Sequence, residues 1–350
     1  MKHIIEGKPK PVLPQVKTVV VDEDSAGQRL DNFLMRHFKG VPKTHVYRII
    51  RSGEVRVNKG RVSADTRVAA GDVVRLPPVR VSERAADKAQ AMQAQSARAA
   101  PAREFVVLHE DEFVLAIDKP AGVAVHGGSG VSFGVIEQLR MARPEAKFLE
   151  LVHRLDRETS GILLIAKRRS ALKHLQDQFR ERETGKIYLA MVRGQWPSNR
   201  RVLDQALVKY LLPDGERRVR IAGKDDPDGM RSVTLVKVRD LGAAPLSART
   251  GGETAPCSLL EVTIKTGRTH QIRVHLASAG YPILGDDKYG DFELNKTLGR
   301  NDRSSALRRM FLHAWRLQFC HPGSGQVMEL MADLPAELEE FANHVITPSA

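Results

Sequence analysis

The chain has 350 residues, a formal net charge of +13 and a pI of about 9.9. Its hydrophobic content of 42% suits a globular protein of two or more domains, and no apolar run is long enough to span a membrane. The first residues hold no secretory signal, and two isolated cysteines, Cys257 and Cys320, argue against a disulfide framework or a cysteine-based zinc site. We therefore expect a cytoplasmic protein with a polyanionic partner.

The amino-terminal part of the chain carries most of the excess positive charge. Residues 1–16 are rich in Pro and Lys and are expected to form a disordered arm. In the unit that follows, 17–80, positions 29–80 hold 12 Lys or Arg and 4 Asp or Glu, a net charge of +8. Because the excess is gathered in one small unit, it favours a nucleic-acid partner over a generally basic surface.

This small unit has the pattern of two helices followed by a hairpin. Apolar residues at helical spacing indicate one helix over 28–35, and a second helix is expected over 44–50 with Thr44 as its N-cap. A glycine turn ends the second helix. Short alternating segments at 55–58 and 73–76 then predict a β-hairpin.

A linker and a large domain follow this unit. Residues 81–103 are rich in Ala, Gln, Arg and Ser and predict a flexible linker. Residues 104–345 combine many strands with a few helices, which indicates an α+β domain on a mixed, mostly antiparallel sheet with flanking helices. Two stretches, 212–230 and 242–256, are expected to be surface loops. The expected strands are 105–108, 113–117, 162–166, 186–192, 202–208, 232–238, 259–265 and 317–320.

One nine-residue stretch, His153–Gly161, combines charged residues with a turn. It reads HRLDRETSG, so that Asp156 lies between Arg154 and Arg157, and the apolar run 162–166 follows at once. An acid held by flanking cations at the mouth of a buried strand stays ionised and oriented, as a nucleophile must. The residues alone also allow an ordinary Arg–Asp pair that closes a loop.

Three further segments carry residues suited to binding or catalysis. Lys119 lies in a Pro/Gly turn after a strand, where it is either structural or in contact with a substrate. Tyr188 lies at a strand start and by itself is typical of a core residue. His270 and Arg273 are three apart on one face of an expected helix, a polar cluster suited to a phosphate or a catalytic acid. His270 and His275 are five apart and diverge around the helix, so they do not predict a metal site.

Together these segments resemble a known family. HRLDRETSG, with the motifs around Lys119, Tyr188 and Arg273, resembles the active-site pattern of the RluA-type pseudouridine synthases. The order of helices and hairpin in 17–80, with the phrase Ser52–Asn58, resembles an S4 RNA-binding domain. The resemblance implies an isomerase that converts uridine to pseudouridine within RNA. Such a reaction needs no cofactor, metal or nucleotide, and the sequence has no phosphate loop or dinucleotide fingerprint.

The resemblance also assigns roles at the reacting centre. Asp156 is implied to be the catalytic carboxylate, and Tyr188 is implied to stack against the target base, a contact worth about 1–3 kcal/mol. Arg273 is implied to pair with Asp156, and Arg268 is the alternative for that pair. Arg154 is implied to occupy the space that a flipped base leaves in the RNA.

Other residues are implied to contact RNA or to hold the site. His153 is expected either to order its loop or to contact a phosphate. In the S4-like unit, two helices are implied to present basic side chains to the RNA backbone, which supplies affinity and orientation. The residues implied to bind RNA are His153, Arg154, Arg268, His270 and Lys119, and in the S4-like unit Arg29, Lys43, Thr44, Arg48 and Arg51.

The expected partner is the large-subunit ribosomal RNA or its precursor particle, bound by a monomer. The run Lys43–Arg48 and the compact C-terminal domain are most similar to the RluC type of the family, and the RluD type shares nearly every motif. The alternatives are therefore an RluD-type enzyme, a synthase that acts on transfer RNA, and a non-catalytic RNA-binding factor in ribosome assembly. The intact set of Asp156, Tyr188 and Arg273 argues for an enzyme.

Overall fold

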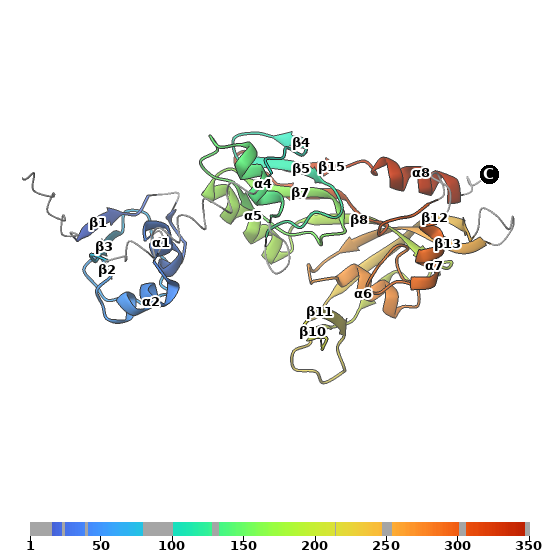
Figure 1. The fold of residues 1–350 in the computed structure, drawn as a ribbon, viewed down its shortest axis with the longest axis horizontal. Coiled ribbons are helices and arrows are strands. Elements are labelled where there is room, and N and C mark those ends of the chain that lie inside the picture. The colour runs from blue at the N-terminus through green and yellow to red at the C-terminus, as the bar shows by residue number, and fades with distance from the viewer. Residues whose placement is uncertain are drawn as a thin grey trace, which may run out of the picture. The chain divides into compact units, whose positions relative to one another are not determined.

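A computed structural model describes residues 16–22, 25–38, 41–79, 101–127, 133–213, 215–246, 254–300 and 306–346. The chain divides into two compact units, 1–99 and 100–350, which are considered separately (Figure 1). The expected arm, 1–16, and the expected linker, 81–103, lie almost wholly outside the described residues.

The first unit packs two helices against a small antiparallel sheet. The helices are α1 (Leu30–His37) and α2 (Lys43–Arg51), and the sheet order is β1-β3-β2, with strands β1 (Lys17–Val20), β2 (Arg56–Val57) and β3 (Val73–Leu76). Both expected helices are confirmed, because their apolar residues are buried in one cluster: Leu30, Phe33, Leu34, Val46, Ile49 and Ile50. The expected N-cap is wrong. Pro42 precedes the first residue of α2, and Thr44 lies inside the helix with an exposed side chain.

The second unit is built on a ten-stranded mixed sheet. Its path is β4-β5-β7-β14-β8-β13-β12-β9, with β15 paired to β14 and β6 paired to β7. The β7–β14 pair is parallel and the other pairs are antiparallel. The strands are β4 (Val106–Glu110), β5 (Val114–Lys119), β6 (Glu150–Leu151), β7 (Ser160–Ala166), β8 (Gly185–Arg193), β9 (Val202–Asp204), β12 (Val233–Pro245), β13 (Thr254–Ile264), β14 (Leu312–Cys320) and β15 (Val327–Met331).

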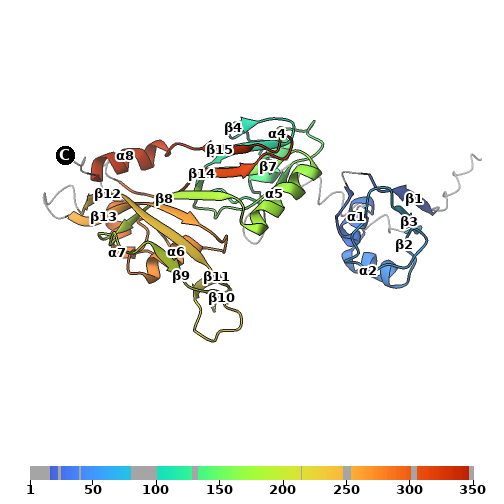
Figure 2. The same cartoon turned by 180° about the vertical axis from the view of Figure 1, so that it is seen from behind.

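Helices cover both faces of the sheet, which explains why its central strands read as continuous apolar runs. Along β7, Leu163 and Ile165 join one core cluster, whereas Ile162 and Leu164 join the other. Figure 2 shows α5 lying along β7 and β14, in agreement with their contacts. The helices are α4 (Val135–Ala142), α5 (Arg169–Glu181), α6 (Gln271–Ser278), α7 (Phe292–Leu298) and α8 (Ala336–Val345).

Two stretches that were expected to be loops contain strands instead. Residues 212–230 include β11 (Arg217–Ile221), which pairs with β10 (Leu207–Leu211) as a separate two-stranded sheet. Residues 242–256 extend the β12–β13 hairpin as far as the pair Pro245–Thr254. Glycine has a reason to stand in that hairpin, because a Cβ on Gly242 would lie 2.3 Å from the carbonyl oxygen of Val345. Small residues here therefore reflect close packing against the end of α8.

Candidate active site

The stretch His153–Gly161 forms the loop between β6 and β7. It ends where β7 comes against β14, and Gly161 there has a φ of +107°. A Cβ at this position would lie 2.3 Å from the carbonyl oxygen of Ala314. Both the positive φ and this close approach favour glycine. A turn precedes Gly161. It is closed by a 3.1 Å hydrogen bond from the Thr159 amide to the Asp156 carbonyl oxygen. The loop thus holds Asp156 at the mouth of a buried strand.

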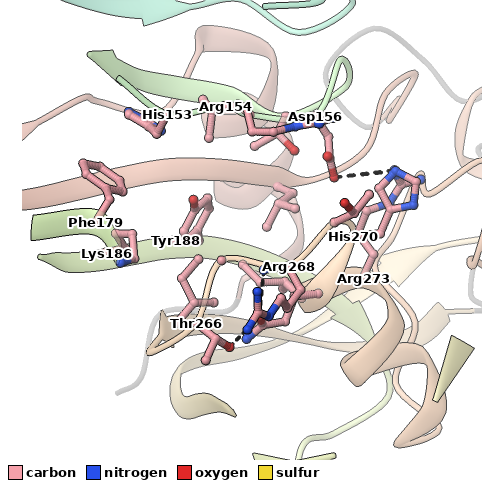
Figure 3. Close-up of a pocket in the computed structure, with 18 of the residues that line it drawn as sticks. His153, Arg154, Asp156, Phe179, Lys186, Tyr188, Thr266, Arg268, His270 and Arg273 are labelled. Carbon is pink, nitrogen blue, oxygen red and sulfur yellow. Dashed lines mark hydrogen bonds and ion pairs between the residues drawn. The ribbon is translucent and has the colours of Figure 1, made fainter. Parts of the chain in front are cut away.

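Asp156 faces two groups from the region of α6. Its Oδ2 lies 3.9 Å from Nε2 of His270 and 4.0 Å from Nη1 of Arg273 (Figure 3). These distances give electrostatic attraction without a short hydrogen bond. The carboxylate, with 18% of its side chain exposed, remains accessible from the cavity. Of the two arginines considered for this pair, the structure places Arg273 there, and Arg268 has no ion pair with Asp156 among the described residues.

A second carboxylate, Asp286, holds Arg273 in place. Its oxygens accept from Nε and Nη2 of Arg273 at 2.7 and 2.6 Å, and the two side chains are 1% and 2% exposed. Burial opposes ionisation of Asp286, but the bonds from Arg273 lower the pKa of Asp286 below its usual value. The same pair raises the pKa of Arg273 despite burial. Asp286 lies in a turn and was not identified from the sequence, where the Gly-Asp-Asp run 285–287 was the available signal.

His270 is oriented by Tyr289, another residue of that turn. The Tyr289 hydroxyl lies 2.8 Å from Nδ1 of His270 and accepts a 3.0 Å bond from the Val219 amide. Burial lowers the pKa of His270 even though Asp156 opposes this shift, which favours the neutral ring. The hydroxyl can donate its proton to Nδ1, and Nε2–H of the neutral ring then faces Asp156.

A cavity of about 510 Å³ opens beside Asp156. Tyr188 lies between the Asp156 end and the Lys186 end in Figure 3. The tyrosine is 9% exposed, and burial, with a contribution from the charge of Asp156, raises the pKa of its hydroxyl. That hydroxyl remains protonated and has no hydrogen-bond partner among the described residues. The aromatic ring is therefore available to a flat ligand.

The lining of this cavity is strongly basic. It contains six Lys or Arg side chains and a single carboxylate, that of Asp156. Nε of Arg268 is buried without a hydrogen-bond partner. A second cavity of about 560 Å³ shares Arg154, Asp156, His270 and Arg273 with the first, so Asp156 is reached from both. The basic lining residues of the first cavity are Arg154, Arg180, Arg182, Lys186, Arg268 and Arg273.

Lys119 has a structural position, which corrects the expectation that it could bind RNA. Its side chain is fully buried, and Nζ donates to the carbonyl oxygens of Pro120, Val123 and Arg157 at 2.8, 2.9 and 3.2 Å. Burial, helped by the charge of Arg309, lowers the pKa of Lys119 to about 7. The residue ties the loop after β5 to the Asp156 loop and has no access to a ligand.

His153 also holds the loop, which favours the first of its two expected roles. Its Nε2 accepts a 3.1 Å bond from the Leu164 amide, and its ring stacks on Phe179 with centroids 4.7 Å apart. Burial, with the nearby charge of Lys186, lowers the pKa of His153 to about 3. A neutral ring whose acceptor is occupied offers no charge to a phosphate.

In the first unit, the residues expected to bind RNA differ in whether their side chains are exposed or already bonded within the protein. Lys43, Thr44, Arg48 and Arg51 are exposed along α2. Arg29 is partly committed instead, because its Nε and Nη2 donate to Asp31 at 3.2 and 2.8 Å. Four of the five expected residues therefore form one accessible surface on α2.

Neither a metal cluster nor a membrane helix is found within the part of the chain that the structure describes. The His, Cys, Asp and Glu residues there form no group of three that could hold a metal ion. None of the helices there is both long enough and apolar enough to cross a membrane.

Known proteins are similar to this chain over nearly its whole length. Residues 113–278 match the family described as RNA pseudouridylate synthase, and residues 28–74 match the S4 domain. The chain is 49% identical over 326 residues to the ribosomal large subunit pseudouridine synthase C of Salmonella typhimurium (strain LT2), covering 93% of this chain and 95% of that protein. The protein of the same description from Haemophilus influenzae is 46% identical over 324 residues, covering 93% of each.

Solved structures show the same fold. The human RNA pseudouridylate synthase domain containing 4 aligns with a TM-score of 0.55 and 26% identity, over 73% of this chain and all of that one. The human domain containing 1 protein aligns with a TM-score of 0.55 and 25% identity, over 69% of this chain and 88% of that one. The expected α+β fold with an S4 domain ahead of it is confirmed. The chain belongs to the RNA pseudouridylate synthases, a family of isomerases.

Proposed function

We propose that this protein converts uridine to pseudouridine in the RNA of the large ribosomal subunit, with Asp156 as the catalytic carboxylate. The observation that carries the proposal is the position of Asp156. It is the single carboxylate in the lining of a basic cavity, with Arg273 and His270 beside it and the ring of Tyr188 further along. The substrate follows from the description shared by the relatives that align over nearly the whole chain.

The reaction asks little of the protein beyond positioning and electrostatics. The bond between N1 of uracil and C1′ of the ribose breaks, the base turns, and C5 joins C1′. C5 then loses its proton and N1 gains one, so that the product is an isomer of the substrate. A carboxylate next to C1′ can stabilise the positive charge there, attack C1′, or take a proton from C2′. All three roles require the carboxylate form of Asp156, and the guanidinium of Arg273 lies 4.0 Å from it.

The remaining side chains fit the handling of a flipped base. A base within a helix is unreachable, and extruding it costs a few kcal/mol. Tyr188 can stack against the uracil, and Arg154, which is exposed at the rim of both cavities, is placed to enter the vacated space. His270 and Arg268 can contact the ribose or a phosphate from the opposite wall.

The decisive experiment replaces Asp156 with Asn. This change keeps the shape of the side chain, so we expect pseudouridine formation in a ribosomal RNA fragment to disappear while RNA affinity stays within a few fold. Glu183→Gln is the matched control, because Glu183 is exposed and does not line the cavity. Measurable turnover in the Asp156→Asn variant would refute the assignment. A primary deuterium isotope effect at C2′ in the unchanged protein separates proton abstraction from attack at C1′.

The RNA target has its own test. Pseudouridines in ribosomal and transfer RNA are mapped in cells with and without the gene. We expect positions to be lost from the large-subunit RNA alone. Loss from transfer RNA would overturn the proposed substrate and leave the proposed chemistry intact.

A further inference from the structure

The active-site cavity holds more positive charge than the protein itself neutralises. Two of its six basic residues have carboxylate partners: Arg273 is bound by Asp286, and Arg180 lies 2.6 Å from Asp177. The other four have no ion pair with any residue that the structure describes. These four unpaired cations are Arg154, Arg182, Lys186 and Arg268.

Lys186 is the most deeply buried of the four. It is 8% exposed, its Nζ donates to Oγ1 of Thr184 at 2.7 Å, and it lies 5.2 Å from the centroid of the Phe179 ring. Burial, and after it the charge of Lys265, lowers the pKa of Lys186 to about 8. Both influences act against the ammonium form. A buried cation without a counter-charge is costly, and a bound anion removes that cost.

The unpaired cations at one end of the cavity lie away from the reacting centre. Lys186 and Tyr188 are two apart on β8, so their side chains leave the same face about 6.8 Å apart. Figure 3 shows Asp156 and Lys186 at opposite ends of the cavity, with Tyr188 between them. Arg182 lines the same cavity and is exposed as the C-cap of α5, in the left-handed conformation with φ +67°. No carboxylate lines this end.

We propose that Lys186 and Arg182 bind a phosphodiester group of the RNA strand next to the target uridine. The inference rests on the proposed function, since it takes the target base to lie at Tyr188 and the strand to continue past it. The RNA backbone carries one anion per nucleotide, so any substrate that places its base at Tyr188 brings phosphates close by. Contacts of this kind fix the register of the strand and do not read its sequence.

The test combines protein variants with RNA in which single phosphates have lost their charge. The substrate is a ribosomal RNA fragment that the unchanged protein modifies, with methylphosphonate placed at one flanking linkage at a time. We expect Lys186→Met to raise KM about ten- to hundredfold, the loss typical of a charge-assisted bond. One methylphosphonate position should raise KM similarly in the unchanged protein and have no further effect in the variant.

Arg182→Gln repeats the experiment at an exposed position where folding is not at stake, and should couple to the same linkage. Lys173→Met is the control for the loss of one charge, because Lys173 is exposed on α5 and does not line the cavity. Effects of variant and methylphosphonate that multiply at every linkage would overturn the proposal, as would an unchanged KM for both variants. A failure of the unchanged protein to make pseudouridine would instead refute the proposed function.

Discussion

At the scale of single residues, the site depends on one arginine, Arg273, which lies among three carboxylates: Asp156, Asp286 and Asp287. Asp286 accepts two short hydrogen bonds from Arg273. The guanidinium of Arg273 lies 4.0 Å from Asp156 and attracts this carboxylate electrostatically. Because Arg273 is fixed by Asp286, it can attract Asp156 without forming a close bidentate pair with it. The carboxylate oxygens of Asp156 are thereby left open to the cavity. The residue that keeps Asp156 available is thus Asp286, which is buried and lines neither cavity.

Asp286→Asn tests whether Asp286 holds Arg273 in place and thereby keeps Asp156 accessible. The change leaves only Asp156 and the exposed Asp287 as counter-charges for the buried Arg273, which is then free to move towards Asp156, so we expect turnover to fall while RNA affinity changes little. We also expect the free energy of unfolding to drop by about 3–5 kcal/mol, the cost of breaking a buried pair from one side. Single-turnover assays and urea unfolding measure the two effects.

Asp287→Asn is the matched control for that change. Asp287 contacts the same guanidinium at 3.1 Å but is 60% exposed, so its loss should cost less than about 1 kcal/mol. Equal losses of stability and turnover in the two variants would contradict the role given to Asp286.

At the scale of elements, the Asp156 loop is attached to the sheet where β7 meets β14. Oγ of Ser160 lies 2.8 Å from Nδ1 of His313, whose Nε2 lies 3.0 Å from the Ala332 carbonyl oxygen. Arg309 donates to the same Ser160 hydroxyl at 2.7 Å. With a neutral ring, the Ser160 hydroxyl donates to Nδ1 of His313, and Nε2–H donates to the Ala332 carbonyl oxygen. Burial favours this neutral form of His313.

The neutral His313 predicts a loss of stability in acid. Burial lowers the pKa of His313 to about 4, against 6.5 in the unfolded chain. As the pH falls from 6.5 to 4, the unfolded state binds a proton that the folded state does not. The free energy of unfolding should then fall by roughly 1.4 kcal/mol per pH unit from this group. Urea unfolding at pH 7 and pH 5 measures the slope.

His313→Gln keeps a donor and an acceptor in the same place but has no proton to bind. Its stability should therefore depend less steeply on pH than that of the unchanged protein. The slope that remains should include His153, whose pKa is lowered in the same direction. Identical slopes for the two proteins would show that His313 does not cause the acid sensitivity.

Elements with a strong periodic pattern could be predicted from the sequence, and those set by distant contacts could not. The helices α1 and α2 could be predicted because their apolar residues recur at helical spacing. The charged segment that forms β11 has no such pattern, since Val219 is its single buried residue in the two-stranded sheet. Gly242 looked like a loop residue, because its packing against Val345 depends on a segment a hundred positions away.

The same limit applies to the candidate site. The resemblance to the family's motifs was sufficient to assign Asp156, Tyr188 and Arg273 to one site, because each of them lies within a short motif. The burial of Lys119 could not be foreseen, because lysine is almost never fully buried unless it is paired. The run around Asp286 did not reveal its partner, because the pairing with Arg273 exists only in the folded chain.

At the scale of the whole molecule, charge is divided between two tasks. The first unit carries exposed cations on α2, and its S4 match agrees with a surface for an RNA backbone. In the second unit, four cations that have no ion pair with any described residue line the cavity beside Asp156. We expect the α2 surface to supply affinity that depends strongly on salt, and the cavity to supply the position of one nucleotide.

Replacing Lys43, Arg48 and Arg51 together with Gln in the full chain separates these tasks. Each phosphate contact contributes about 0.7–0.9 to the slope of log affinity against log salt, so the loss of three contacts should reduce the slope by roughly 2–3. Turnover at saturating RNA should stay unchanged, because the cavity is untouched. Binding measured by filter retention from low to high salt gives the slope. Equal effects from a control triple with the same loss of charge on the second unit would contradict a local role for α2; its exposed positions are Lys173, Lys224 and Lys296.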